Sequence, residues 1–327
     1  MSKSNPKLAD RLQGPTHQDK AREREKALAK RIGDLEQQLA SALDSIDKQR
    51  HSAVRVLKGK PTETKGTFSR FIIADTHGCW IDNKAAAAML RDLELIRPQE
   101  IVLMGDHLDC AGWLANHHPF KTVQEAKYSF REDVEAANWF LDEVCNRAPS
   151  ARIHYLEGNH EERIEAWIVE QTKQDARDAA YLRTMFSPET VLGLEKRKIT
   201  YYRRTAKHSR LRLRGMLRLG KCHFVHGISH ARNAASVHLQ KVKNNVVFGH
   251  THRPQEDSTA DTLTEYGAWC PGCLCEFEPM WKHSQPTEWA HGYGLQCVAS
   301  DGSFVHINAR IVNGTSLLLP LIENTGK

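Results

Sequence analysis

The sequence predicts an α/β fold in which reactive side chains follow the ends of buried strands. Five short apolar runs, rich in Val and Ile, end at a Gly or a polar residue, which is typical of buried strands. Segments with helical spacing lie between several of these runs, so strands and helices alternate. A motif that contains Asp, Asn or His follows each run. The runs are residues 71–74, 101–104, 153–156, 222–225 and 245–248.

Residues 1–60 predict a helical arm that differs from the rest of the chain. They are charged, poor in aromatic residues, and carry apolar residues at spacings of three or four. These apolar residues are Leu28, Ile32, Leu35, Leu39, Leu43 and Ile46. The pattern predicts a helix over residues 18–49 with a narrow apolar stripe, which needs a partner. The stripe either packs on the rest of the chain or joins a second copy as a coiled coil in a homo-oligomer; DNA binding by the arm is a third alternative.

Residues 61–67 have the composition of a linker, so residues 68–327 form one large domain. Within it, helices are predicted where apolar residues recur at helical spacing, and a hairpin is predicted around the strong turn signal Asp301-Gly302. The predicted helices are residues 83–96, 122–145, a segment after His160, and 175–186. The predicted hairpin strands are residues 293–299 and 303–310.

The most basic part of the chain is residues 196–221, with eleven Lys or Arg and no acidic residue. Residues 210–219 alternate with period two, which predicts an exposed hairpin with Arg210, Arg212 and Arg214 on one face. Such a face attracts a polyanion, because Lys and Arg contacts to phosphates release condensed counterions. DNA or RNA is therefore the expected partner, and a solvated surface without a ligand is the alternative.

Apolar segments and cysteines predict the compartment. No apolar stretch approaches the roughly 18 residues of a membrane span, and the amino terminus lacks the apolar segment of a secretory signal. A cytoplasmic location without a membrane partner is expected. Thiols stay reduced there, so the eight cysteines are expected to be free or metal-bound.

The five motifs after the strands contain carboxylate and amide oxygens and imidazole nitrogens, which suit a pair of divalent metal ions. In order, the motifs are Asp75-Thr76-His77, Gly105-Asp106-His107-Leu108-Asp109, Gly158-Asn159-His160-Glu161, Val225-His226-Gly227 and Gly249-His250-Thr251-His252. In open α/β sheets, ligands bind outside the carboxyl ends of the strands, so the motifs are expected to cluster there. Hydrolysis of a phosphate ester is the leading interpretation.

With these motifs in this order, the chain resembles the calcineurin-like metallophosphoesterase superfamily, which includes members common in bacteriophage genomes. The resemblance covers about residues 68–312. It implies a four-layer αββα sandwich and two metal ions, for which Mn, Fe, Zn and Ni all suit the ligands. The implied ligands are Asp75, His77 and His252 for the first ion, Asn159, His226 and His250 for the second, and Asp106 as the bridge between them.

The resemblance also implies a mechanism. Two ions about 3.5–4 Å apart lower the pKa of a bridging water and hold a phosphate for in-line attack. His160 is expected to face the leaving group and to protonate it or stabilise its charge. Asp109 is the predicted partner of His160, because a carboxylate on one imidazole nitrogen fixes the tautomer and raises the pKa.

One departure from the family bears on the substrate. The protein serine/threonine phosphatase branch carries Arg-Gly after the second motif, where this chain has Cys110-Ala111. A thiol cannot replace the bidentate phosphate contact of a guanidinium, so a protein phosphatase is disfavoured. The predicted function is a metal-dependent phosphodiesterase or nuclease that acts on nucleic acid or nucleotides. A small-molecule phosphomonoesterase and a non-catalytic assembly component that works through the arm are the alternatives.

Residues 270–297 contain four cysteines in a segment rich in Gly and Trp. The cysteines are Cys270, Cys273, Cys275 and Cys297. A Cys-x2-Cys step is compatible with a structural zinc site, but a second pair at regular spacing is absent. The preferred interpretation is a loop, including Trp281 and Trp289, that packs beside the metals and shapes the entrance for substrate.

Overall fold

The computed structural model of the chain describes residues 17–57, 66–111, 114, 128–208, 213–260, 264–278, 287–316 and 318, with side chains in the first range from residue 21 to 45. The chain divides into two compact units, Met1–Pro61 and Thr62–Lys327. Among the described residues, no helix combines the length and the apolar character that crossing a membrane requires.

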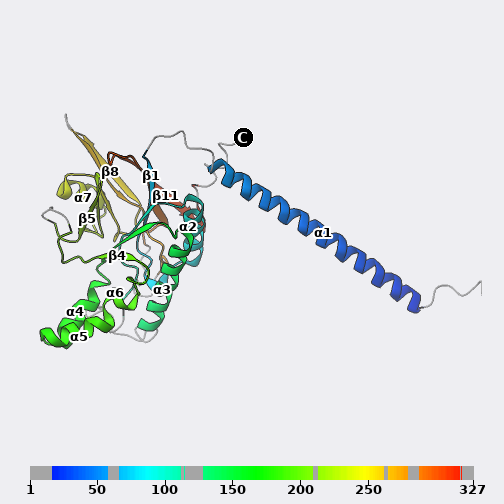
Figure 1. Cartoon of the computed structure of the whole chain (residues 1–327), viewed down its shortest axis with the longest axis horizontal. Coiled ribbons are helices and arrows are strands. Elements are labelled where there is room, and N and C mark those ends of the chain that lie inside the picture. Colours follow the sequence, from blue (N-terminus) through cyan, green and yellow to red (C-terminus); the bar gives the residue numbers. More distant parts are fainter. Residues whose placement is uncertain are drawn as a thin grey trace, which may run out of the picture. The chain divides into compact units, whose positions relative to one another are not determined.

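The first unit contains one long helix, α1 (His17–Leu57), shown in blue in Figure 1. The predicted amino-terminal helix is therefore confirmed, and it continues beyond residue 49. The stripe side chains from Leu28 to Leu43 are each between 54% and 62% exposed. Within the first unit, the stripe from Leu28 to Leu43 is thus left unpacked. Residues 1–16 and 58–65, which include most of the predicted linker, lie outside the described residues.

The larger sheet of the second unit has a parallel half and an antiparallel half. The parallel strands are β1 (Phe68–Ile73), β2 (Glu100–Leu103), β3 (Arg152–Leu156) and β4 (Ile199–Tyr202), in that order. The antiparallel strands continue from β1 as β10 (Gly292–Val298), β11 (Phe304–Val312) and β12 (Thr315–Ser316). Ile73 is opposite Leu103, and Leu103 is opposite Tyr155. The first three strands therefore end level with one another, and the loops that follow them share one edge.

The smaller sheet has five strands and also contains neighbouring parallel strands. In order across the sheet, they are β5 (Met216–Leu219), β6 (Cys222–Val225), β7 (Val246–Phe248), β9 (Glu265–Cys270) and β8 (Gln255–Ala260). The three central strands are parallel, and Val225 lies opposite Phe248. The loops after β6 and β7 consequently leave the sheet side by side.

Three apolar clusters separate the layers. Ile72, Val102, Leu156, Phe224 and Val247 come from both sheets and are at most 1% exposed, so they form the core between the sheets. A second cluster joins the larger sheet to α2 (Asn83–Ile96) and α3 (Phe130–Arg147), and a third joins the smaller sheet to α7 (Ala234–Val242). The predicted αββα sandwich is confirmed (Figure 1).

Most predicted elements are present. The helix at residues 83–96 and the hairpin of β10 and β11 are confirmed, and three helices follow β3. They are α4 (Glu162–Gln171), α5 (Ala176–Phe186) and α6 (Pro188–Val191). Of the helix predicted at residues 122–145, residues 122–127 lie outside the described residues, and the described helix begins at Phe130, because the Ser129 side chain accepts a hydrogen bond from the Glu132 amide and caps it.

The exposed hairpin predicted at residues 210–219 is wrong in its described part. Residues 216–219 form β5, which pairs with β6, and Met216 and Leu217 are buried in the sheet. The alternation of apolar and basic residues had indicated a strand with one solvated face, whereas both faces of β5 pack at its start. Residues 209–212, with Arg210 and Arg212, lie outside the described residues.

Candidate metal centre

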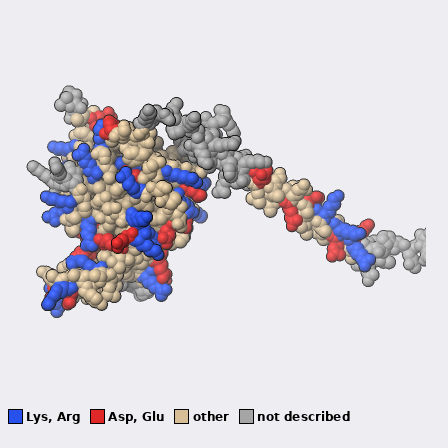
Figure 2. Space-filling model, viewed as in Figure 1, with Lys and Arg blue, Asp and Glu red and all other residues tan. Residues whose placement is uncertain are grey.

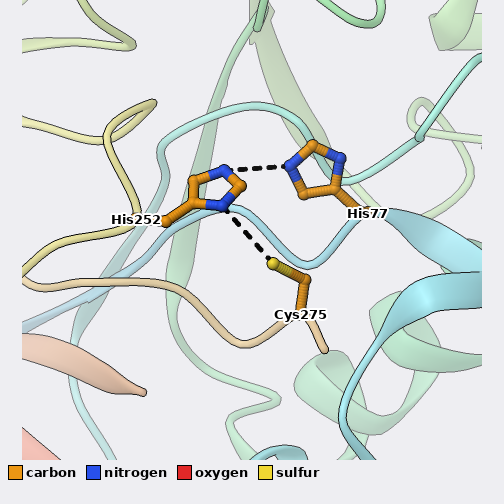
Figure 3. A group of neighbouring side chains, drawn as sticks. All are labelled: His77, His252 and Cys275. Atoms are coloured by element: carbon orange, nitrogen blue, oxygen red, sulfur yellow. Dashed lines mark hydrogen bonds between the residues drawn. The ribbon is translucent and has the colours of Figure 1, made fainter. Parts of the chain in front are cut away.

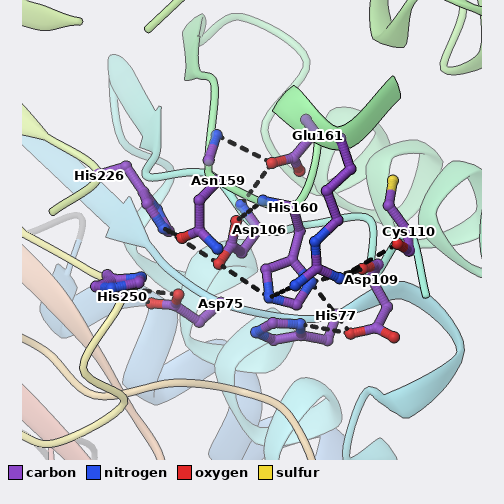
Figure 4. A network of polar contacts seen from close by, with 12 residues as sticks. Asp75, His77, Asp106, Asp109, Cys110, Asn159, His160, Glu161, His226 and His250 are labelled. Carbon is purple, nitrogen blue, oxygen red and sulfur yellow. Dashed lines mark hydrogen bonds and ion pairs between the residues drawn. The ribbon is translucent and has the colours of Figure 1, made fainter. Parts of the chain in front are cut away.

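The loops after β1, β2, β3, β6 and β7 bring the five predicted motifs to one edge of the sandwich (Figure 4). Five of the seven predicted metal ligands have a left-handed backbone. They are Asp75, His77, Asp106, His250 and His252, with φ between 52° and 67°. Such a backbone costs on the order of 1–3 kcal/mol at each non-glycine residue and is typical of functional sites.

Two glycines let the loops approach these side chains closely. A Cβ on Gly158 would lie 2.0 Å from Asp106 Oδ1, and a Cβ on Gly249 would lie 2.8 Å from Asp75 Oδ2. Both distances are too short for any side chain. Glycine at these two positions is therefore required by the carboxylates beside it.

The first group of predicted ligands consists of Asp75, His77 and His252. His77 Nε2 lies 3.1 Å from His252 Nε2, and His252 Nε2 lies 3.4 Å from Asp75 Oδ1. Ligand atoms of Asp75, His77 and Asp106 also lie within 4.8 Å of one another. Two nitrogens bound to one ion at about 2.0–2.1 Å are separated by roughly 3 Å, so the histidine pair fits a shared cation.

The second group consists of Asn159, His226 and His250. His226 Nε2 lies 2.9 Å from Asn159 Oδ1 and 3.1 Å from Asp106 Oδ2. Ligand atoms of Asp106, His226 and His250 lie within 4.8 Å of one another. Asp106 thus belongs to both groups, as a bridging carboxylate would.

Hydrogen bonds on the outer side of two rings orient them for metal binding. His226 Nδ1–H donates to the Met104 carbonyl at 2.9 Å, and His77 Nδ1–H donates to Asp109 Oδ1 at 3.0 Å. Because both acceptors require a proton on Nδ1, the lone pair of each Nε2 faces the cluster. This arrangement of a ligand imidazole and an outer acceptor is usual at metal sites, and the residues present fit two ions.

The electrostatics of the cluster also suit cations. Burial would raise the pKa of Asp106, but the charges of His226 and His160 outweigh burial and hold the pKa well below its ordinary value. Burial lowers the pKa of His250 to about 4, so its ring is neutral at pH 7. Burial would lower the pKa of His226, yet Asp106 raises it to about 9. Binding of an ion at His226 must therefore release a proton.

A family model for the calcineurin-like phosphoesterases matches residues 70–254, more than half of the chain. The chain belongs to the calcineurin-like phosphoesterase family. It is therefore a metal-dependent phosphoric ester hydrolase with two divalent metal ions as its cofactor. The oxygen and nitrogen donors suit Mn, Fe, Zn or Ni.

Solved structures that match the chain include two proteins of low sequence identity. Vacuolar protein sorting 29 from Cryptosporidium parvum is 10% identical, with a TM-score of 0.40, and the match covers 77% of this chain and 95% of that one. Yfce, a phosphoesterase from E. coli, is 16% identical, with a TM-score of 0.30, and the match covers 73% of this chain and 98% of that one. No curated protein matches the sequence with significance.

Beside the metal groups of this phosphoesterase, Asp109 contacts two histidines. Its Oδ1 lies 3.0 Å from His77 Nδ1 and 3.4 Å from His160 Nδ1. The predicted contact between Asp109 and His160 is thus present, but the carboxylate is shared. His160 Nδ1 also lies 2.5 Å from the main-chain oxygen of Asp109. Burial would raise the pKa of Asp109, and its hydrogen bonds to His160 and His77 reverse the shift, so the carboxylate stays ionised.

Glu161 is a functional residue to which the sequence assigned no role. Its buried carboxylate accepts hydrogen bonds from the amides of Asp106, His107, Leu108 and Gly158 at 2.7–3.1 Å. One side chain therefore fixes both the loop that carries Asp106 and the loop that carries Asn159. The signal in the sequence was an acidic residue directly beside the predicted ligands.

Asp133 on α3 plays a similar part for Asp109. Its carboxylate accepts from the amides of Asp109 and Cys110 and from the Tyr128 hydroxyl at 2.7–3.1 Å. Burial raises the pKa of Asp133 to about 6, and the charge of Asp109 adds to this. An acidic residue between the apolar positions of a buried helix face was the signal for this contact.

The loop from the carboxy-terminal region packs against the first metal group, as predicted. His252 Nδ1 lies 3.5 Å from Cys275 Sγ, and Figure 3 shows His252 between Cys275 and His77. The Trp289 ring lies 4.1 Å from the His252 ring, centroid to centroid. Burial raises the pKa of the Cys275 thiol well above its ordinary value, so the thiol is neutral. Trp281 lies outside the described residues.

The four-cysteine zinc site does not assemble in the described part of the chain. Among those residues, Cys275 groups with histidines of the metal centre, while Cys297 is exposed on β10 and Cys270 contacts Thr251. All eight cysteines are free thiols.

Proposed function

We propose that this phosphoesterase hydrolyses phosphodiester bonds of nucleic acids or nucleotides. The observation that carries the proposal is the position of Arg204, one residue of the basic segment 196–221, beside the loop of Asn159. The Arg204 amide donates to Glu157 Oε2 at 2.7 Å, and Arg204 Nε lies 3.6 Å from Glu162 Oε2. Both acids flank the loop of Asn159. A phosphate backbone drawn to Arg204 would therefore lie next to the reacting groups.

In this proposal, the two groups of side chains hold the two ions. Asp75, His77 and His252 would bind the first, Asn159, His226 and His250 the second, and Asp106 both; the distances between their ligand atoms support this assignment. Two such ions supply a water of lowered pKa and neutralise charge on the phosphate.

The chain's own proton donor would be His160. Its Nδ1 faces Asp109, which fixes the ring, and its Nε2 lies 3.9 Å from Asp106 Oδ2, on the side of the metal groups. From there His160 would donate a proton to the oxygen that leaves phosphorus, while Asp109 stabilises the ring.

A phosphomonoesterase acting on a small molecule is the second candidate, and pairing of the basic residues favours it. Of the nine basic residues of the segment that the structure describes, four contact acids from other parts of the chain. The pairs are Arg197–Asp142, Arg203–Glu189, Arg204–Glu162 and Lys221–Asp301. On the face seen in Figure 2, patches of Asp and Glu lie among those of Lys and Arg. The net positive field is therefore weaker than the run of basic residues suggests.

The test is a substrate panel with purified protein and added divalent metals. Rates on bis(p-nitrophenyl) phosphate, single- and double-stranded DNA and RNA are compared with the rate on p-nitrophenyl phosphate. The proposal expects turnover of the diesters, with nucleic acid preferred at low salt. Turnover of the monoester alone would overturn it.

For α1 we propose self-association through the exposed apolar stripe. A helix with Leu and Ile open to solvent along several turns is expected to bury them against a second copy. Deletion of residues 1–60 should lower the mass in light scattering to that of a monomer and leave turnover of the small diester within about twofold. An unchanged oligomer would contradict a coiled coil.

A further inference from the structure

Arg163 lies on the first turn of α4, three residues after His160, and reaches into the candidate centre. Its Nη1 donates to the main-chain oxygens of Asp109 at 3.0 Å and Cys110 at 3.2 Å. Its Nη2 donates to His160 Nε2 at 3.1 Å. The guanidinium therefore sits on the ring nitrogen that would face the leaving group.

The charge of Arg163 has no counter-charge among its described contacts. Its acceptors are two main-chain carbonyls and a ring nitrogen, and none is a carboxylate. Three arginines of the same region are each paired with a glutamate. The pairs are Arg183–Glu165, Arg203–Glu189 and Arg204–Glu162. A half-buried cation without an anion in direct contact is costly, unless an anionic ligand completes the site.

We propose that Arg163 binds the phosphate of the substrate. A guanidinium is planar and carries five N–H donors, so it can hold two phosphate oxygens at once while still bonded to a carbonyl. The carbonyls of Asp109 and Cys110 fix Nη1, and Nη2 exchanges His160 Nε2 for a non-bridging phosphate oxygen. The exchange leaves His160 Nε2 free to take up a proton from water and then to face the leaving oxygen.

With this role, Arg163 supplies the phosphate-binding cation that Cys110 cannot provide. The Cys110 side chain is buried, and burial raises the pKa of its thiol well above the ordinary value, so it offers no charge to a substrate. Arg163 supplies a cation at the same loop from a different element, α4. The inference rests on the proposed function only in its choice of substrate, because any phosphate ester presents non-bridging oxygens.

The test compares Arg163→Gln, Arg163→Lys and Arg163→Ala with the matched control Arg183→Gln in the full-length, metal-loaded protein. KM and kcat are measured on bis(p-nitrophenyl) phosphate, and inorganic phosphate is titrated as an inhibitor. Loss of Arg163 should raise KM and the inhibition constant of phosphate in parallel, by about 10–100-fold. Arg163→Lys should recover part of this loss, and added guanidinium ion should reactivate Arg163→Ala. The control should stay within about twofold.

A structural role alone gives a different result. If Arg163 only anchors the loop, kcat falls while KM and phosphate inhibition stay as in the wild type, and guanidinium ion has no effect; that result overturns the proposal. If Arg163→Gln does not fold, Arg163→Lys is the deciding variant. Inhibition of Arg163→Lys by phosphate at the wild-type level would also overturn the proposal. If wild type cleaves only p-nitrophenyl phosphate, the proposed diesterase function fails, and the same comparison is made on the monoester.

Discussion

The metal edge and the basic segment differ in how far their sequence determines the contacts of their side chains. At the edge, each predicted ligand follows a buried strand, and parallel strands that end level bring the ligands together. The basic segment, residues 196–221, carries positive charges only, yet several of these charges are paired with acids 14–80 residues away. At the metal edge, the ends of the strands determine where the ligands lie. In the basic segment, contacts with residues distant in sequence determine which charges remain unpaired.

The difference shows which kind of motif carries function in this chain. A ligand after a strand has its position set by the register of the sheet, so a short motif is sufficient to locate it. The effect of a charged residue depends on every acid that the fold places beside it. Substitutions at the edge should therefore act on turnover directly, whereas substitutions in the basic segment should act only on some substrates.

The largest effect is expected from Asp106→Asn. This change removes the carboxylate shared by both ligand groups, so turnover should fall by at least about a thousandfold and metal content should decrease. The readouts are rates on bis(p-nitrophenyl) phosphate and elemental analysis. Asp142→Asn, on an exposed site of α3, is the matched control. Retention of more than a tenth of the activity would contradict a bridging role.

A smaller loss is expected from Glu161→Gln. An amide can replace only part of the acceptor capacity that Glu161 offers to the loops of Asp106 and Gly158, so the ligands should loosen. Turnover or metal affinity should fall by about 10–100-fold, as for other residues that orient metal ligands. Glu162→Gln, one residue away and partly exposed, should change either value by less than about threefold. Equal effects of both changes would show that the carboxylate of Glu161 has no special role.

Reversal of Arg210, Arg212 and Arg214 to Glu sharpens the contrast between the regions. If the basic segment binds a polyanion, KM for DNA should rise about tenfold or more, and the dependence of binding on salt should weaken by about 0.9 per lost phosphate contact. Turnover of bis(p-nitrophenyl) phosphate should not change. Reversal of Lys173, Arg177 and Lys243, which are exposed elsewhere, controls for net charge. A similar loss in both triple variants would remove any special role of the segment.

The smallest effect on turnover is expected from Glu157→Gln, which instead changes how stability depends on pH. Burial raises the pKa of Glu157 to about 7 in the folded chain, from 4.5. A carboxyl whose pKa is raised on folding stabilises the fold below pH 4.5, and this contribution is lost as the pH rises through 7. Relative to the variant, the wild type should therefore lose up to about 3 kcal/mol between pH 4.5 and pH 8. The free energy of unfolding of both metal-free proteins is measured with denaturant at several pH values. A difference between wild type and variant that does not change with pH would contradict the raised pKa of Glu157.

Much of the fold and the positions of the candidate ligands could be predicted from the sequence. Asp75, Asp106 and Asn159 each follow a short buried strand, and the register of those strands then brings them together. Glu161 and Arg163 were missed because their roles arise from contacts up to 55 residues away. A carboxylate that binds loop amides looks in the sequence like any solvated acid.

The strand that begins at Ile199 was missed for a local reason, because basic residues on both sides of it masked a short apolar run. Likewise, the start of α3 depended on the cap at Ser129, which the apolar stripe alone does not reveal. These errors share one cause. Periodicity predicts which residues are buried but not where a hydrogen-bonded end stops an element.

The most direct measurement is anomalous diffraction from crystals of an active, metal-loaded preparation. Two peaks are predicted, about 3.5–4 Å apart, one beside His77 and His252 and the other beside His226 and His250, with Asp106 between them. A single peak, or peaks distant from Asp106, would contradict a metal pair held at the carboxyl ends of these strands.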